Sequence, residues 1–156
     1  MQGRSLQQWL DEYDSSHRHP VNKAIHWVCV PAIMLSLLAL LWLVRIPLPW
    51  SIPWLLNTAV CFLLPVMIYY LLLSPRLAAG MLLVFGVLLY LITALERLQT
   101  PLWRIALVIF VVAWIGQFIG HHIEGKRPSF FKDLQFLLIG PLWLLAALYR
   151  RFNLAC

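Results

Sequence analysis

Four apolar stretches, each about as long as a lipid bilayer is thick, limit what this chain can fold into. They run over residues 24–44, 52–73, 77–95 and 102–119. A helix of about 20 apolar residues spans the roughly 30 Å hydrocarbon core of a membrane. The mean hydropathy of the chain, +0.82, is too high for a soluble domain of 156 residues. We therefore predict an all-α integral membrane protein, a bundle of four transmembrane helices.

A fifth apolar stretch, residues 134–149, is shorter and contains Gly140 and Pro141. Because these residues interrupt helices, a broken, a re-entrant and a fully spanning C-terminal helix all remain open. About two dozen polar residues precede the first apolar stretch, unlike a cleaved signal, so we expect the first span to be retained. We expect one membrane domain over 1–156, with a polar segment at 1–23, spans over 24–119, a second polar island at 120–133 and the C-terminal helix.

The formal net charge of +6 could indicate nucleic acid as a partner, but the basic residues stand singly or in pairs at the ends of apolar stretches. That distribution fits anionic lipid headgroups and argues against nucleic-acid binding. The three cysteines show no CxxC spacing, so no disulfide framework is expected.

All five histidines fall in the two polar islands that flank the four spans. Four crossings return the chain to the side from which it started, so the two islands can meet at one face of the membrane. The predicted side of the membrane that carries the histidines has more lysines and arginines than the other side, whichever way residues 134–149 run. By the positive-inside rule we expect the histidines to face the cytoplasm.

The first island contains His17, His19 and His26. Proline favours the first turn of a helix, so a helix is expected to begin near Pro20 with His19 at its cap. Asn22 and His26 are four residues apart and share a face of that helix. His17 can join His26 only if the chain bends before Pro20.

The second island contains His121, His122 and Glu124. If the fourth helix continues through it, Gln117, His121 and Glu124 form one stripe, in which Gln117 can orient a ligand by a hydrogen bond. His122 is turned about 100° away from His121. Imidazole and carboxylate groups are the usual ligands of transition metals, so a metal site at the bilayer surface is one interpretation. The other is that the histidines are solvated interfacial residues and that Glu124 pairs with nearby cations.

The two islands resemble those of the membrane family related to the fungal 2-hydroxy fatty acid dioxygenase, and the resemblance covers essentially the whole chain. Its motifs here are His17-x4-Asn22-x3-His26 with a turn at Val30-Pro31, and Gln117-Phe-Ile-Gly120-His121 followed by Glu124 and Pro128.

The resemblance implies an Fe(II)-dependent enzyme that uses O2 to shorten a 2-hydroxy fatty acid by one carbon. It implies His17, His26 and His121 as metal ligands and catalytic residues, to which we add Glu124 as a plausible fourth. His19 and His122 rank lower as ligands.

The substrate-binding candidates are Asn22, Lys23, Gln117 and Arg127, because their side chains can hold a carboxylate or a hydroxyl group beside the metal. Arg18 and Lys126 are further cations that could meet the carboxylate. The acyl tail is expected to lie among the spans.

Two other classes of function compete with the oxygenase. One is a non-enzymatic lipid-binding membrane protein with structural histidines, and the other is a metal-dependent lipid hydrolase. A metal transporter is disfavoured, because the central spans carry almost no ionisable residues. The sequence gives no oligomeric state.

Overall fold

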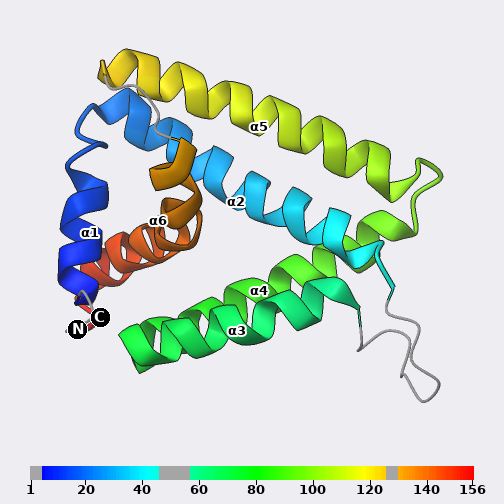
Figure 1. Cartoon of the computed structure of the whole chain (residues 1–156), viewed down its shortest axis with the longest axis horizontal. Coiled ribbons are helices and arrows are strands. Elements are labelled where there is room, and N and C mark those ends of the chain that lie inside the picture. Colours follow the sequence, from blue (N-terminus) through cyan, green and yellow to red (C-terminus); the bar gives the residue numbers. More distant parts are fainter. Residues whose placement is uncertain (1–4, 46–56, 126–129) are drawn as a thin grey trace.

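The computed structural model describes residues 5–45, 57–125 and 130–156, and the regular elements in these ranges are all helices (Figure 1). The prediction of an all-α chain is thereby confirmed. The helices are α1 (Leu6–Asp14), α2 (Pro20–Trp42), α3 (Thr58–Leu73), α4 (Pro75–Glu96), α5 (Leu102–Glu124) and α6 (Phe130–Arg151).

The four helices α2 to α5 alternate in direction and form two pairs (Figure 1). Helix α2 packs against α5, and α3 packs against α4. The pairs diverge toward the end where α2 begins and α5 ends, and there α1 and α6 lie between them (Figure 1). We call this the histidine end, since the alternation brings both polar islands to it.

Within the described ranges three helices, α2, α4 and α5, are long and apolar enough to cross a membrane. Helix α3 is apolar but has only 16 residues, so the prediction of four transmembrane helices is not confirmed. The predicted second span began at residue 52, and its first five residues, 52–56, lie outside the described ranges. Large apolar side chains such as Leu72, Leu83 and Val108 are exposed on the outer faces, as expected for helices that contact lipid.

The start of α2 follows the sequence prediction. Pro20 is the first residue of the helix, and His19 caps it by accepting a hydrogen bond from the Val21 N–H at 3.2 Å. The expected turn at Val30 and Pro31 is wrong, because α2 runs through both residues without a break. An internal proline removes only one helical hydrogen bond, and helices of membrane proteins tolerate it where neighbouring groups compensate.

Helix α1 lies in the segment that was expected to be merely polar. Ser5 and Gln8 form a capping box, in which each side chain bonds to the other's backbone N–H. Leu10 and Tyr13 are buried on the face of α1 that packs against α6. The sequence signals of α1 are therefore the spacing from Ser5 to Gln8 and the apolar residues that follow it.

Helix α6 is one helix that contains Gly140 and Pro141, and it changes direction along its length (Figure 1). Proline accounts for a bend of this kind. In its last turns Tyr149 donates a hydrogen bond to the Arg76 carbonyl at 3.2 Å, at the start of α4. Only residues 126–129 separate the start of α6 from the described range that contains α5, so both ends of α6 lie toward the histidine end. This favours the broken or re-entrant form over a full span.

The α2–α5 contact is close because two glycines of α5 face α2. A Cβ at Gly116 would lie 2.6 Å from the Cys29 sulfur, and one at Gly120 would overlap the Asn22 side-chain oxygen. Real Cβ atoms do not approach other atoms so closely, so a side chain at either position would force the Cys29 or Asn22 side chain, or the helices themselves, to shift. The one-turn spacing of Gly116 and Gly120 predicts such an approach, and the structure confirms it.

We expect Gly120→Ala to destabilise the protein, because the new methyl group meets Asn22, whose side-chain nitrogen is held by Glu124 at 3.1 Å. Overpacking of this kind costs about 1–3 kcal/mol. Thermal unfolding in detergent measures the loss. Gly86→Ala in α4 is the matched control, since no atom lies within 4 Å of its Cβ position. Equal unfolding temperatures for the two variants would contradict the close α2–α5 contact.

Candidate metal centre

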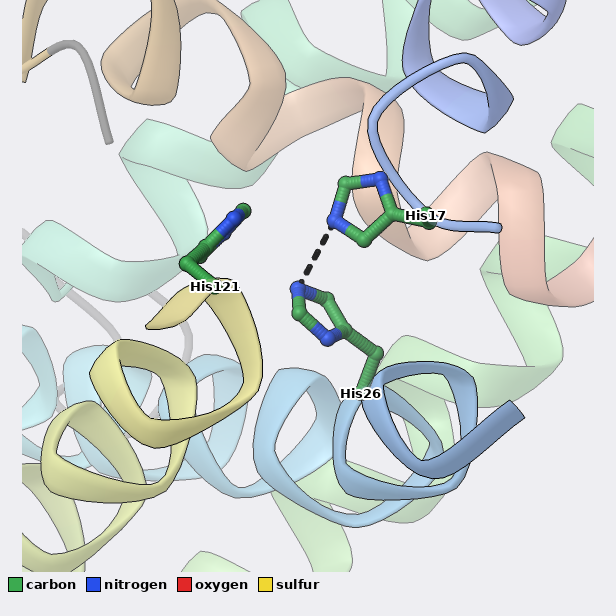
Figure 2. Close-up of side chains that lie close together, drawn as sticks. All are labelled: His17, His26 and His121. Atoms are coloured by element: carbon green, nitrogen blue, oxygen red, sulfur yellow. Dashed lines mark hydrogen bonds between the residues drawn. The ribbon is translucent and has the colours of Figure 1, made fainter. Parts of the chain in front are cut away.

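Three histidines from separate parts of the chain meet at the histidine end. His17 lies between α1 and α2, His26 is on α2 and His121 is on α5. Figure 2 shows the three rings turned toward a common space, and one ligand nitrogen of each lies within 4.8 Å of the other two. His17 and His26 are buried and His121 is half-buried. The sequence prediction that the two islands converge is therefore confirmed.

The hydrogen bonds of His17 and His26 determine where their protons lie. His17 Nδ1 is 2.7 Å from the Tyr13 carbonyl oxygen, and His26 Nδ1 is 2.9 Å from that of Asn22. A carbonyl oxygen only accepts hydrogen bonds, so each Nδ1 must carry the hydrogen. In the neutral imidazole the other nitrogen, Nε2, then carries a lone pair.

The two Nε2 atoms face each other at 2.9 Å (Figure 2). Two lone pairs at this distance repel, unless a cation lies between them. Histidine nitrogens bind transition metals at about 2.0–2.1 Å, so neighbouring ligands of one ion lie about 3 Å apart. The donor set and its spacing therefore fit a metal ion.

A shared proton is the competing explanation for the close nitrogens, and the pKa of His17 argues against it. Burial, with a smaller contribution from the nearby His121, lowers this pKa from 6.5 to about 4, although the hydrogen bond to Tyr13 acts in the opposite direction. His17 is consequently neutral at pH 7, which is the form that binds metals.

Aromatic rings from α1 and α6 enclose the histidines on one side. Tyr13 stacks on His17 with ring centroids 4.1 Å apart, and the Trp143 ring is 5.6 Å from that of His17. Asp14 accepts hydrogen bonds from the Trp143 indole at 3.2 Å and from Lys23 at 3.3 Å. Sequence reasoning missed these neighbours. Tyr13 had a signal, four residues before His17, but the contact with Trp143 arises only from the packing of α1 against α6.

Glu124 lies beside the three histidines, but the metal-binding group within the described ranges does not include it. Its carboxylate accepts hydrogen bonds from the backbone N–H groups of Arg18 and His19, both at 2.9 Å, and from the Asn22 side-chain nitrogen at 3.1 Å. The free N–H groups and the dipole at the start of a helix favour a carboxylate there. Glu124 therefore joins the end of α5 to the start of α2.

The remaining candidates have separate places. His19 is exposed and caps α2, and His122 is exposed and turned away from the centre, as its position next to His121 predicts. Gln117 is buried one turn before His121, and its side-chain oxygen has no hydrogen-bond partner among the described residues. Arg127 and Lys126 lie outside the described ranges. Neither His19 nor His122 belongs to the three-histidine group.

We expect His121→Ala to lose bound metal while His122→Ala keeps it. The first change removes one of three converging nitrogens, whereas the second removes an exposed ring from the next position of the same helix. Elemental analysis of protein purified without chelator measures metal per chain. Equal metal contents in both variants would contradict the proposed centre.

Glu124→Gln should weaken metal binding by about 10- to 100-fold and also lower the stability of the metal-free protein. The amide has one acceptor oxygen where the carboxylate has two, so the join between α5 and α2 loosens. Titration with metal and thermal unfolding measure the two effects. Glu96→Gln, whose carboxylate bonds to Trp42 at 3.3 Å at the opposite end of α2, is the control. Unchanged metal-free stability, with metal binding lost, would instead indicate that Glu124 is a ligand.

Two comparisons with known proteins find relatives of the chain. The family model described as "2-hydroxy-palmitic acid dioxygenase Mpo1-like" matches residues 3–152. The 2-hydroxy-palmitic acid dioxygenase MPO1 of Saccharomyces cerevisiae is 32% identical over 143 residues, which cover 90% of this chain and 77% of the yeast protein. No solved structure matches the chain. The chain belongs to the Mpo1-like family of 2-hydroxy-palmitic acid dioxygenases.

Proposed function

We propose that this protein is an Fe(II)-dependent dioxygenase that shortens 2-hydroxy fatty acids by one carbon at the membrane surface. The observation that carries the proposal is the pair of imidazole lone pairs that face each other at 2.9 Å, with His121 beside them. The name of the yeast relative supports the substrate class. The apolar helices support a substrate that arrives from the lipid.

His17, His26 and His121 would hold the iron, and the remaining coordination positions stay open. When bound, Fe(II) would supply the activation of O2 and a binding position for the hydroxyl and carboxylate groups of the substrate. Because the Nδ1 atoms of His17 and His26 donate to backbone carbonyls, both rings are oriented before metal or substrate arrives.

The proposed reaction balances with one molecule of O2 and needs no external reductant. The bond between the carboxyl carbon and the hydroxyl-bearing carbon breaks, and the carboxyl carbon leaves as CO2. The hydroxyl-bearing carbon is oxidised and becomes the new carboxyl carbon. The O2 is reduced, and one water molecule forms.

Two side chains next to the centre are suited to hold the polar end of the substrate. The Lys23 ammonium group lies 5.9 Å from the centroid of the Trp143 ring, at the rim of the centre, and can offer a carboxylate its remaining hydrogen-bond donors. The buried oxygen of Gln117 can accept a hydrogen bond from the substrate hydroxyl. Asn22 contributes indirectly, since its side-chain nitrogen bonds to Glu124. Arg127 stays a candidate from the sequence alone.

We also propose that the histidine end faces the cytoplasm. The contact between Tyr149 and Arg76 brings the C-terminal arginines to this end. Among the residues whose side chains the structure describes, the cations at the histidine end then outnumber those at the other end, which supports this orientation by the positive-inside rule. They are Arg18, Lys23, Arg76, Arg150 and Arg151 against Arg45, Arg97 and Arg104.

Oxygen uptake by the iron-loaded protein in detergent tests the proposed function. With 2-hydroxypalmitate we expect O2 consumption and release of a fatty acid one carbon shorter, identified by mass spectrometry. His26→Ala should reduce this activity by at least about a hundredfold, since it removes one of the three nitrogens that hold the metal.

Palmitate, which lacks the hydroxyl group, is the control substrate and should give no uptake. His122→Ala should keep the wild-type rate. Zinc-containing protein that hydrolyses lipid esters without O2 would favour the hydrolase, and protein that binds no metal would favour the lipid-binding alternative.

A further inference from the structure

An apolar cavity of about 30 Å3, partly open to its surroundings, lies between α2, α3, α4 and α6. Met34 and Leu38 of α2, Leu63 and Val66 of α3, and Phe85 of α4 contribute to its wall. The volume would admit a water molecule, but water in a cavity needs two or more polar partners. The apolar lining therefore favours apolar groups over water.

The one polar side chain in the wall is already engaged. Tyr70 is almost completely buried, and its hydroxyl group donates a hydrogen bond to the Leu138 carbonyl on α6 at 2.7 Å. The Leu138 carbonyl, three residues before Pro141, is thereby occupied. The cavity wall consequently offers a ligand mainly methyl, methylene and aromatic groups.

The cavity follows the face of α2 that carries the metal centre. His26, Val30 and Met34 are spaced four residues apart, which places them on one face, and Met34 lies about 12 Å along the helix axis from His26. Helix α6 also borders both regions, because Pro141 lines the cavity and Trp143 contacts His17. The metal centre and the cavity are therefore successive regions along one side of α2.

The residues of α3 give the cavity a near and a far end. Helix α3 runs opposite to α2, so Tyr70 lies toward the histidine end and Leu63 about two turns deeper in the bundle (Figure 1). Leu38 is the corresponding deep residue of α2. A linear ligand whose polar end lies at the histidines would reach Met34 first and Leu63 last.

We propose that the cavity receives methylene groups of the acyl chain of the 2-hydroxy fatty acid, and that Leu63 and Val66 limit the length of chain that fits. This proposal rests on the proposed function, since it takes the polar end of the ligand to be at the three histidines. The occupant is the tail of the substrate, because an apolar chain would replace the missing contacts of the cavity wall.

Val66→Phe tests the proposal by filling the cavity. We expect kcat/KM for 2-hydroxypalmitate to fall by about tenfold or more, while that for 2-hydroxyoctanoate changes little, because the shorter tail does not reach Val66. Ile68→Phe is the matched control, since it adds a similar ring to the same helix at a position 59% exposed. Equal losses for both acids, with unchanged iron content, would overturn the proposal.

Leu63→Ala tests the proposal by enlarging the cavity. It also keeps the proposal testable if the Val66→Phe protein folds poorly. The smaller side chain deepens the far end, so the preferred acyl chain should become longer than in the wild type. Leu64→Ala, on the 61% exposed neighbouring residue, should leave the chain-length profile unchanged. An unchanged profile in Leu63→Ala would overturn the proposal.

Binding of palmitate to the metal-free protein separates this proposal from the proposed function. If the wild type consumes no O2 with either hydroxy acid, the dioxygenase function fails. Even then, weaker palmitate binding by Val66→Phe than by Ile68→Phe supports the cavity as an acyl site. Equal palmitate affinities in these two variants overturn the acyl site, whatever the enzymatic activity.

Discussion

The close antiparallel contact between α2 and α5 is the constraint on which the rest of the molecule depends. Gly116 and Gly120 let the two helices approach, and Glu124 fastens the end of one to the start of the other. Without this contact nothing would hold His121 near His26, because the two residues lie on the first and the last of four successive helices. The site is thus a consequence of helix packing more than of local sequence.

The second constraint acts on the protons of the histidines. The backbone carbonyls of Tyr13 and Asn22 each accept a hydrogen bond from the Nδ1 atom of the histidine four residues later, which is His17 or His26. The same spacing occurs at the end of α1 and in the first turns of α2, although the two segments lie at an angle to each other. Two local interactions therefore orient two of the proposed ligands, and the bend before Pro20 directs them to one point.

Much of this arrangement follows from local rules that act on the sequence. The start of α2 is predictable because Pro20 and His19 suit the first turn and the cap of a helix, and the convergence of the islands follows from counting apolar stretches. The role of Glu124 is not predictable in this way. Carboxylates serve both as ligands and as helix caps, and only the distance to the α2 backbone distinguishes the two.

Other features depend on long-range packing or on competing local preferences. The short length of α3 arises where apolar sequence alone predicts a span, since hydropathy measures what a segment can contact and not where its helix begins. For α6 the sequence left a broken, a re-entrant and a spanning helix open, and the bend appears only in the folded chain. The turn expected at Val30 and Pro31 is absent, because the neighbours of α2 maintain the helix through a proline, a residue that tends to interrupt helices. The enclosure of His17 by Trp143 requires the contact between α1 and α6, which no short motif encodes.

The order of the ligands along the chain has a consequence for biogenesis. His17 and His26 are synthesised early, but His121 follows only after three further helices, and Trp143 later still. Chains are made from the N-terminus, so the metal centre cannot be complete until nearly the whole protein has been inserted and its helices paired. Metal occupancy of the proposed centre would thereby report on correct assembly, and a chain with one helix inserted in the wrong direction would be recognisable by its lack of metal.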